Sequence, residues 1–341
     1  MPHRTFLAFI LPSLIAMLVF IALPVVSVGV QSLYVEHDKV LVQVDNCGPF
    51  GCQQELRIDG EATAQLQARE PLGQFNGLGT YANRSHLALT EIGEILGANS
   101  GWRDIAARIY DLQFYKALAF TLVYTFAVTP LALVLGFVIA LAVNALPGLL
   151  KGPVIFFSLL PMIVTPLVGS LILFWMLNSQ GILGAMFQSL TGDRGLYLEA
   201  SPVLTWITLL IYGVWTNAPF SFVVFYAGLQ TVSQETLEAA TIDGANRWQR
   251  VRHVIIPAIA PLATFAVLVQ LMDNFRVFEP IAGFSAQANA TSLSWSIFND
   301  LHGQASPLFG SAAATSMLTI LGVAILLSPV VVRTWREFNL K

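Results

Sequence analysis

The stretch YKALAFTLVYTFAVTPLALVLGFVIALAVNA, residues 115–145, carries a single charged side chain, Lys116, close to its start. About 20 consecutive apolar residues are enough for a helix to cross the hydrocarbon core of a bilayer, so this stretch predicts a membrane-spanning helix. The composition of the whole chain agrees. Of its 341 residues, 55% are hydrophobic and only 11% are charged. Soluble domains usually carry about 25% charged residues.

Five further apolar runs are long enough to span a bilayer. The six candidates together are residues 6–34, 115–145, 153–177, 202–229, 257–278 and 308–332. We therefore expect an all-α integral membrane protein with six transmembrane helices. The first run is also compatible with a secretory signal peptide. Its apolar stretch is longer than a signal h-region, however, and no clear small-x-small cleavage site follows it.

Lysine and arginine gather at one set of span ends, which predicts that these ends face the cytoplasm. They are Arg4, Lys151, Arg247, Arg250, Arg252, Arg333, Arg336 and Lys341. Both termini are then cytoplasmic in a bacterial inner membrane, and residues 35–114 form an extracytoplasmic insert between the first two spans. The expected division is a first helix at 1–34, this insert, and a five-helix core at 115–341 with a cytoplasmic loop at 231–256.

The insert is expected to have mixed structure. KVLVQV (39–44) alternates as a strand does, and ELRID (55–59) is expected to pair with it. NSGWRDIAARIYDL (99–112) predicts an amphipathic helix at the membrane surface. Cys47 and Cys52 bracket a Gly-Pro turn between the strands. In an oxidising compartment this spacing suits a disulfide, and two free thiols are the alternative.

Several classes of protein are disfavoured by what the sequence lacks. A net charge of −3 gives no basic excess for nucleic acid, and the five histidines show no metal-ligand spacing. The chain contains no Gly-x-Ser-x-Gly, His-Glu-x-x-His or Ser-x-x-Lys pattern and no Gly-x4-Gly-Lys-Ser/Thr loop for ATP. We therefore expect no catalytic site, no metal and no cofactor in this chain.

The loop between the fourth and fifth spans reads SQETLEAATIDGANRWQRVRHVIIP (233–257). Ser233 is a favourable helix N-cap, and Gly244 is expected to end the helix that follows. A second short helix comes next, and Pro257 is expected to open the fifth span as a first-turn proline. These features support two interpretations equally: a helix–turn–helix knob that docks on another protein, or an amphipathic connector resting on lipid headgroups.

This loop resembles the EAA motif of ATP-driven, binding-protein-dependent transport permeases. The matching residues are Glu238, Ala239, Ala240, Gly244, Val254, Ile256 and Pro257, with Val254 and Ile256 where that family prefers Ile and Leu. Asp243, Ala245, Trp248 and Gln249 resemble the DGA-x-x-WQ form of its carbohydrate branch, maltose-type permeases. Segments 75–83, 114–125, 215–230 and 309–318 are similar to other parts of these permeases, with Thr80 and Phe120 where Asn is usual. Segments 35–74, 84–110 and 279–300 depart from the family pattern.

The resemblance implies a permease subunit that translocates a sugar or oligosaccharide delivered by a periplasmic binding protein. A polyol, a sugar phosphate or an amino acid is the alternative solute. The resemblance also implies that the loop couples to a separate ATPase through Glu238, Ala239, Ala240, Asp243, Gly244, Ala245 and Trp248. The implied partners are two ATP-binding subunits carrying ATP and Mg, a binding protein, and a second, different permease, although a homodimer is also compatible with two-fold symmetry.

Polar groups inside spans are costly and usually face a partner or a water-filled cavity. The candidates for a substrate path are Trp175, Asn178, Tyr212, Asn217, Gln270, Asp273, Asn274 and Arg276. Alternatively, Asp273 and Arg276 pair with each other and Trp175 belongs to an interfacial belt. An ion-coupled secondary transporter is the alternative from a different class. It would be expected to show inverted internal repeats, and none is visible in the sequence.

Overall fold

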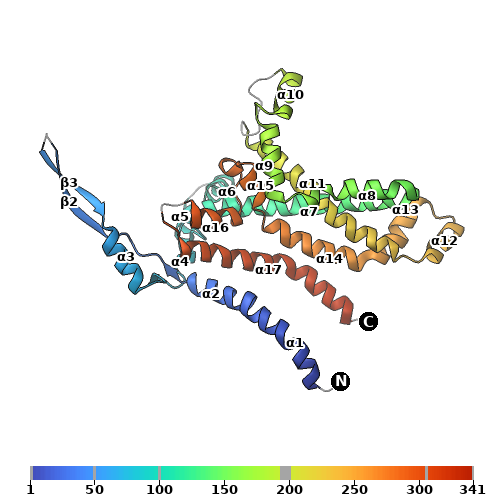
Figure 1. The fold of residues 1–341 in the computed structure, drawn as a ribbon, viewed down its shortest axis with the longest axis horizontal. Helices are drawn as coiled ribbons and strands as arrows, with labels where there is room; N and C mark the ends of the chain where they lie inside the picture. The colour runs from blue at the N-terminus through green and yellow to red at the C-terminus, as the bar shows by residue number, and fades with distance from the viewer. Residues whose placement is uncertain (1–2, 49–50, 99–100, 193–200, 304–305, 340–341) are drawn as a thin grey trace. The chain divides into compact units, whose positions relative to one another are not determined.

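The structure is a computed structural model that describes residues 3–48, 51–98, 101–192, 201–303 and 306–339 (Figure 1). The chain forms two compact units. One contains residues 1–115 and 296–320, and the other contains residues 116–295 and 321–341. We refer to them as the insert unit and the core unit.

The described part of the chain contains five helices that are long and apolar enough to cross a membrane, and a bent pair that adds a sixth if it counts as one span. The five are Phe9–Gln31, Gln113–Ala145, Pro202–Gln230, Arg247–Phe275 and Phe309–Arg336. The first is built from α1 (His3–Met17), a π-helical turn η1 (Leu18–Ala22) and α2 (Leu23–Gln31). The second, third and last correspond to α7 (Gln113–Ala145), α11 (Pro202–Gln230) and α17 (Phe309–Asn339). The prediction of an all-helical membrane protein is confirmed.

The predicted third span is a broken helix. It consists of α8 (Gly148–Ile163) and α9 (Pro166–Leu177), which meet at a bend of 91°. Figure 1 shows α9 leaving the line of α8. Val164 and Thr165 are extended, and Thr165 is pushed out of the helical region because it precedes Pro166. The hydroxyl of Tyr212 donates to the carbonyl oxygen of Pro166 at 2.5 Å, which satisfies a backbone group beside the break.

The fifth span also differs from its prediction. The second short helix of the loop, α13 (Arg247–Arg250), continues without a break through a π-helical turn η3 (Val251–Ile255) into α14 (Ile256–Phe275). Pro257 therefore lies inside a continuous helix and does not open it. Because proline has no N–H to donate, the shifted bonding of a π-helical turn just before it accommodates the missing bond.

Close helix packing builds the core unit. A Cβ added to Gly136 of α7 would lie 2.5 Å from Cβ of Ser221 and 2.6 Å from the backbone nitrogen of Phe222, so only glycine permits this approach of α7 to α11. Small residues at such crossings are typical of membrane helices. Phe222, Phe225 and Ile259 are buried around it. The remaining elements are α10 (Ile182–Thr191), α12 (Gln234–Ile242), α15 (Glu279–Gly283) and the 3-10 turn η4 (Ala286–Ala288).

The insert unit contains an antiparallel hairpin, as predicted. Strand β2 (Leu41–Gly48) pairs with β3 (Gly51–Ile58) in the register Leu41↔Ile58. Cys47 lies opposite Cys52 in this register, but their side chains lie outside what the structure describes, so the disulfide stays a prediction. Helix α3 (Gly60–Arg69) follows, with the carboxylate of Asp59 accepting from the N–H groups of its first turn. Figure 1 shows the hairpin and α3 as an arm extending beyond α2.

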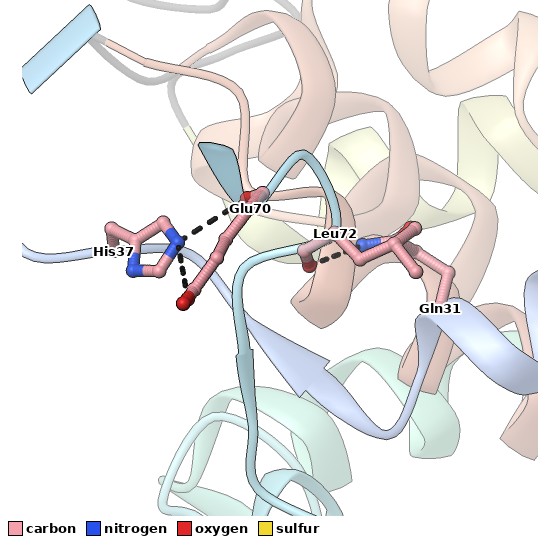
Figure 2. Close-up of polar contacts among 4 residues, drawn as sticks. All are labelled: Gln31, His37, Glu70 and Leu72. Carbon is pink, nitrogen blue, oxygen red and sulfur yellow. Dashed lines mark hydrogen bonds and ion pairs between the residues drawn. The ribbon is translucent and has the colours of Figure 1, made fainter. Parts of the chain in front are cut away.

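Short contacts fix the base of this arm. Strand β1 (Tyr34–Val35) pairs with β4 (Gln74–Phe75), which brings the chain back beside its entry point. Figure 2 shows His37, whose side chain is 3% exposed, with Nε2 at 3.2 Å from the backbone oxygen of Glu70 and 3.4 Å from its carboxylate. In the same view Gln31 Nε2 donates to the carbonyl oxygen of Leu72 at 3.3 Å. The arm is therefore anchored at both of its chain ends.

Four short helices complete the insert unit. They are α4 (Gly79–Ala82), α5 (Leu89–Gly97), α6 (Trp102–Tyr110) and α16 (Leu293–His302), whose last part belongs to this unit. Helix α6 confirms the helix predicted at 99–112, of which residues 99–100 lie outside the described ranges.

Helix α16 carries a partly buried carboxyl group, that of Asp300. Burial raises the pKa of this carboxyl, although the hydroxyl of Ser311 donates to it at 2.7 Å.

Candidate functional site

The loop 231–256 folds into a helix–turn–helix because each end is capped. The hydroxyl of Ser233 accepts from the N–H of Thr236 at 3.2 Å, which starts α12 as predicted. Gly244 ends it with φ of +79°, a left-handed conformation that glycine adopts without strain. Asn246 and Gln249 then form a reciprocal capping box, with both bonds at 2.8 Å, which starts α13.

The tip of this loop exposes large apolar side chains. Ile242 is 87% exposed and Trp248 is 68% exposed. Of the residues predicted to couple to an ATPase, Glu238, Ala239, Asp243, Gly244 and Trp248 are exposed, and Ala240 and Ala245 are half-buried. The prediction omitted Ile242, although its place next to Asp243 in the turn and its apolar character were visible in the sequence. If these side chains adjoin, they give the apolar area, rimmed by polar groups, that is typical of a surface covered by a partner.

One helix joins this loop to a polar cavity. The continuous helix Arg247–Phe275 has 29 residues, with Trp248 near its first residue and Asn274 near its last. At 1.5 Å per residue it spans about 40 Å. One continuous helix therefore runs from the loop to the wall of the cavity.

The cavity has a volume of about 400 Å³ and lies within the core unit. Four of the predicted path residues line it: Asn217, Asp273, Asn274 and Arg276. Tyr124, Thr216 and Glu279 also line it and were not predicted. Tyr124 and Thr216 lie within apolar spans, as many structural residues do. Only the packing of α7 against α11 shows that they line the cavity. Glu279 was visible as a carboxylate just after the fifth span, in the segment that departs from the resembled family.

A buried amide network supports one wall of the cavity. Gln270 and Asn274 are 1% and 2% exposed. Nε2 of Gln270 donates to the backbone oxygen of Asn217 at 2.9 Å and to the hydroxyl of Ser221 at 3.2 Å. Nδ2 of Asn274 donates to the hydroxyl of Thr129 at 2.9 Å and to Oε1 of Gln270 at 3.2 Å. Gln270 thus ties α14 to α11 and does not line the cavity.

Asp273 and Arg276 pair with each other. Nη2 of Arg276 donates to Oδ1 of Asp273 at 2.7 Å, and the two side chains are 58% and 47% exposed, respectively. This is the pairing that the sequence left as an alternative to substrate contact. Because both side chains line the cavity, the pair is also in a position to meet a solute.

The other three predicted path residues lie outside this cavity. Trp175 is 65% exposed on α9. The side-chain oxygen of Asn178 accepts from the hydroxyl of Ser179 at 3.2 Å and the N–H of Gln180 at 3.3 Å, just after α9 ends. Tyr212 is 3% exposed, bonds to Pro166 and borders a separate, mainly apolar cavity of about 460 Å³. Among the described residues, no group of three or more His, Cys, Asp or Glu side chains is arranged to hold a metal.

A comparison with models of protein families identifies the family of this chain. Residues 105–335 match the binding-protein-dependent transport system inner membrane component. The chain belongs to this family. It is therefore a multi-pass inner-membrane permease of a binding-protein-dependent importer and not an enzyme. The permease works with an ATPase on a separate partner.

Relatives of the permease are named for different solutes. It is 28% identical over 251 residues to the trehalose/maltose transport system permease protein MalF of Thermococcus litoralis, covering 72% of this chain and 82% of that one. It is 26% identical over 235 residues to the sn-glycerol-3-phosphate transport system permease protein UgpA of Yersinia enterocolitica, covering 66% and 78%. Its fold matches a bacterial ABC transporter involved in the import of the acidic polysaccharide alginate, with a TM-score of 0.56, 19% identity and coverage of 82% and 97%.

Proposed function

We propose that the permease imports a sugar or oligosaccharide, and that its 231–256 loop transmits ATPase movement to the polar cavity. The observation that carries this proposal is the single helix Arg247–Phe275, which joins the exposed apolar tip of the loop to the cavity wall. Interfaces and packed helices shift between discrete arrangements, so a displaced loop moves the whole helix. Asn217, Asp273, Asn274 and Arg276 then change their spacing around the solute.

The proposed orientation places the loop and both termini in the cytoplasm. Arg247, Arg250 and Arg252 lie at the start of this helix, and Arg333 and Arg336 lie near the end of α17. Positive side chains concentrated at span ends favour the cytoplasmic side. Under this orientation the partners are two ATP-binding subunits below the membrane, a second permease beside it and a binding protein above it.

We also propose that the arm meets the binding protein. The outer strands carry exposed apolar side chains, with Leu41, Leu56 and Ile58 at 57%, 66% and 52% exposure. The base of the arm is fixed by His37 and by the β1–β4 pair, so a load applied to the hairpin reaches the rest of the insert unit. Deleting residues 40–58 should abolish stimulation of the ATPase by the binding protein. Unchanged stimulation in the deletion would rule out this contact.

The loop is tested with Gly244→Val in the complex reconstituted with its ATPase, second permease and binding protein. A β-branched residue does not tolerate φ of +79°, so the turn between α12 and α13 should shift. Open space surrounds Gly244, so the substitution acts through the backbone alone. We expect ATPase stimulation by the binding protein with maltose or trehalose to fall at least tenfold, because an interface displaced by about an ångström loses most of its contacts.

Two variants serve as controls for this experiment. Gly148→Val makes the same change where the φ is negative and the surroundings are also open, and should leave stimulation intact. Gly244→Asn should be milder than Gly244→Val because asparagine tolerates the left-handed region. Full stimulation in Gly244→Val, or solute transport by this chain without any ATPase, would refute the proposal and point to an ion-coupled carrier.

A further inference from the structure

The charges that line the polar cavity do not balance. Its ionisable residues with a full charge at neutral pH are Asp273, Arg276 and Glu279. Arg276 is bonded to Asp273 at 2.7 Å. Glu279 makes no ion pair with any residue that the structure describes. Among the residues that the structure describes, no lysine or histidine lines the cavity, so their lining charges leave one formal negative charge.

Hydrogen bonds within the protein occupy amide and hydroxyl donors of Asn217, Asn274 and Thr216 at the cavity. Nδ2 of Asn217 donates to the backbone oxygen of Gly213 at 2.8 Å, and Nδ2 of Asn274 donates to Thr129 and Gln270. The hydroxyl of Thr216 donates to the backbone oxygen of Tyr212 at 3.0 Å. The amide oxygens of Asn217 and Asn274 accept no bond from the described residues. The two amide oxygens are therefore free to accept from the hydroxyl or ammonium donors of a solute, and Arg276 keeps N–H donors beyond the one bonded to Asp273.

An anionic solute would face two penalties in this cavity. It would be repelled by the uncompensated carboxylate of Glu279, and like charges in a partly desolvated site interact more strongly than in water. If it bonded to Arg276, it would do so beside the carboxylate of Asp273, which adds a second like charge. A neutral polyhydroxylated solute meets neither penalty.

We propose that this cavity selects its solute by charge, admitting neutral or cationic sugars and disfavouring carboxylated or phosphorylated ones, with Glu279 as the specificity-determining residue. The inference rests on the proposed transport path through the cavity. It would separate this permease from the glycerol-3-phosphate permease that it resembles in sequence and from the alginate transporter that it resembles in fold.

The local charge is measured with thiol reagents that need no knowledge of the solute. Thr216→Cys places a thiol on the cavity wall, and Cys47→Ser with Cys52→Ser removes the two native cysteines. The assembled complex is treated with methanethiosulfonates carrying either trimethylammonium or sulfonate. The thiolate attacks the reagent's sulfenyl sulfur, forming a mixed disulfide and releasing methanesulfinate. The ratio of the two rates, divided by the ratio for a free thiol, reports the potential in the cavity.

We expect the cationic reagent to react faster, and Glu279→Gln to lower the corrected ratio about tenfold, as removal of one nearby charge requires. Glu279→Asp should keep the ratio, and Glu235→Gln, the same charge change on the exposed start of α12, should not alter it. Equal rates for the two reagents, no response to Glu279→Gln, or no labelling of Thr216→Cys by either reagent would overturn the inference. Labelling needs no ATPase stimulation. A failed Gly244 experiment would therefore refute the proposed function, and a failed labelling experiment would refute the charge selection, independently of each other.

Discussion

The helix Arg247–Phe275 has exposed apolar side chains at one end and buried polar side chains at the other, the opposite of what is usual at each. At its start, Trp248 is 68% exposed, and Ile242, the last residue of α12, is 87% exposed, although both are large and apolar. At its other end, the amides of Gln270 and Asn274 are almost fully buried inside an apolar span. Exposed apolar groups are common singly, but a buried polar group must be bonded.

The difference teaches which end is complete without a partner. The amide donors of Gln270 and Asn274 already bond to α7, α11 or α14, so these buried donors are satisfied within the chain. The loop end has ordered backbone caps but no cover for its apolar tip. Substitutions at the loop end should therefore weaken assembly and leave the chain stable, whereas substitutions in the amide network should destabilise the chain itself.

The largest effect is expected for Trp248→Ala. Removing a tryptophan from the centre of an interface typically costs about 2–4 kcal/mol of binding free energy. The affinity of the permease for its ATPase should fall accordingly, while the thermal unfolding of the permease alone should not change. Binding is measured between detergent-solubilised permease complex and purified ATPase.

Trp335→Ala is the matched control for that prediction. Trp335 lies near the end of α17 and is 69% exposed, so the same atoms are removed from a similarly accessible site outside the loop. An equal loss of affinity in both variants would show that Trp248 has no special place in the interface. The claim that the loop end of the helix is completed by a partner would then be unsupported.

A smaller effect, on stability, is expected for Asn274→Leu. The substitution leaves the hydroxyl of Thr129 and Oε1 of Gln270 without their donor in a buried site. Bonds between membrane helices are individually modest, so we expect a loss of about 1 kcal/mol. Gln230→Leu removes a comparable side-chain bond, 3.2 Å to Asn144, from an exposed site and should cost less than about 0.5 kcal/mol. Equal losses measured by thermal unfolding in detergent would contradict the claim that the network stabilises the chain.

Features governed by local rules were predictable from the sequence. The apolar runs predicted the spans, the alternation in KVLVQV predicted strand β2, and Ser233 and Gly244 predicted the start and end of α12. Each of these depends on residues within a turn or two of one another. The helix–turn–helix of the loop could therefore be predicted without any tertiary structure.

Features governed by packing were not predictable. Prolines are tolerated in membrane helices, so Pro161 and Pro166 alone do not predict a break, and only the structure shows that the chain bends by 91° before Pro166. The fifth span continues through Pro257 because a π-helical turn precedes it. The cavity joins Tyr124, Thr216 and Glu279 from three separate elements, so no spacing in the sequence connects them.

The smallest effect is expected inside the loop, for Thr241→Val. Its hydroxyl donates to the backbone oxygen of Leu237 at 2.8 Å and accepts from Nη1 of Arg250 at 3.0 Å, which ties α12 to α13. Removing one exposed bond of this kind costs less than about 0.5 kcal/mol. We expect the α12 amides to exchange hydrogen up to about twofold faster in the variant, as that free energy allows.

Thr241→Ser keeps the hydroxyl and should keep the exchange rate, which separates the bond from the loss of a methyl group. The result bears on why the loop end works without a buried core. If the Thr241–Arg250 bond orders α12 before any partner binds, less conformational entropy is lost on docking, and the exposed Trp248 and Ile242 are presented in one geometry. If exchange is the same in all three proteins, the order of the loop comes from its caps at Ser233 and Asn246 alone.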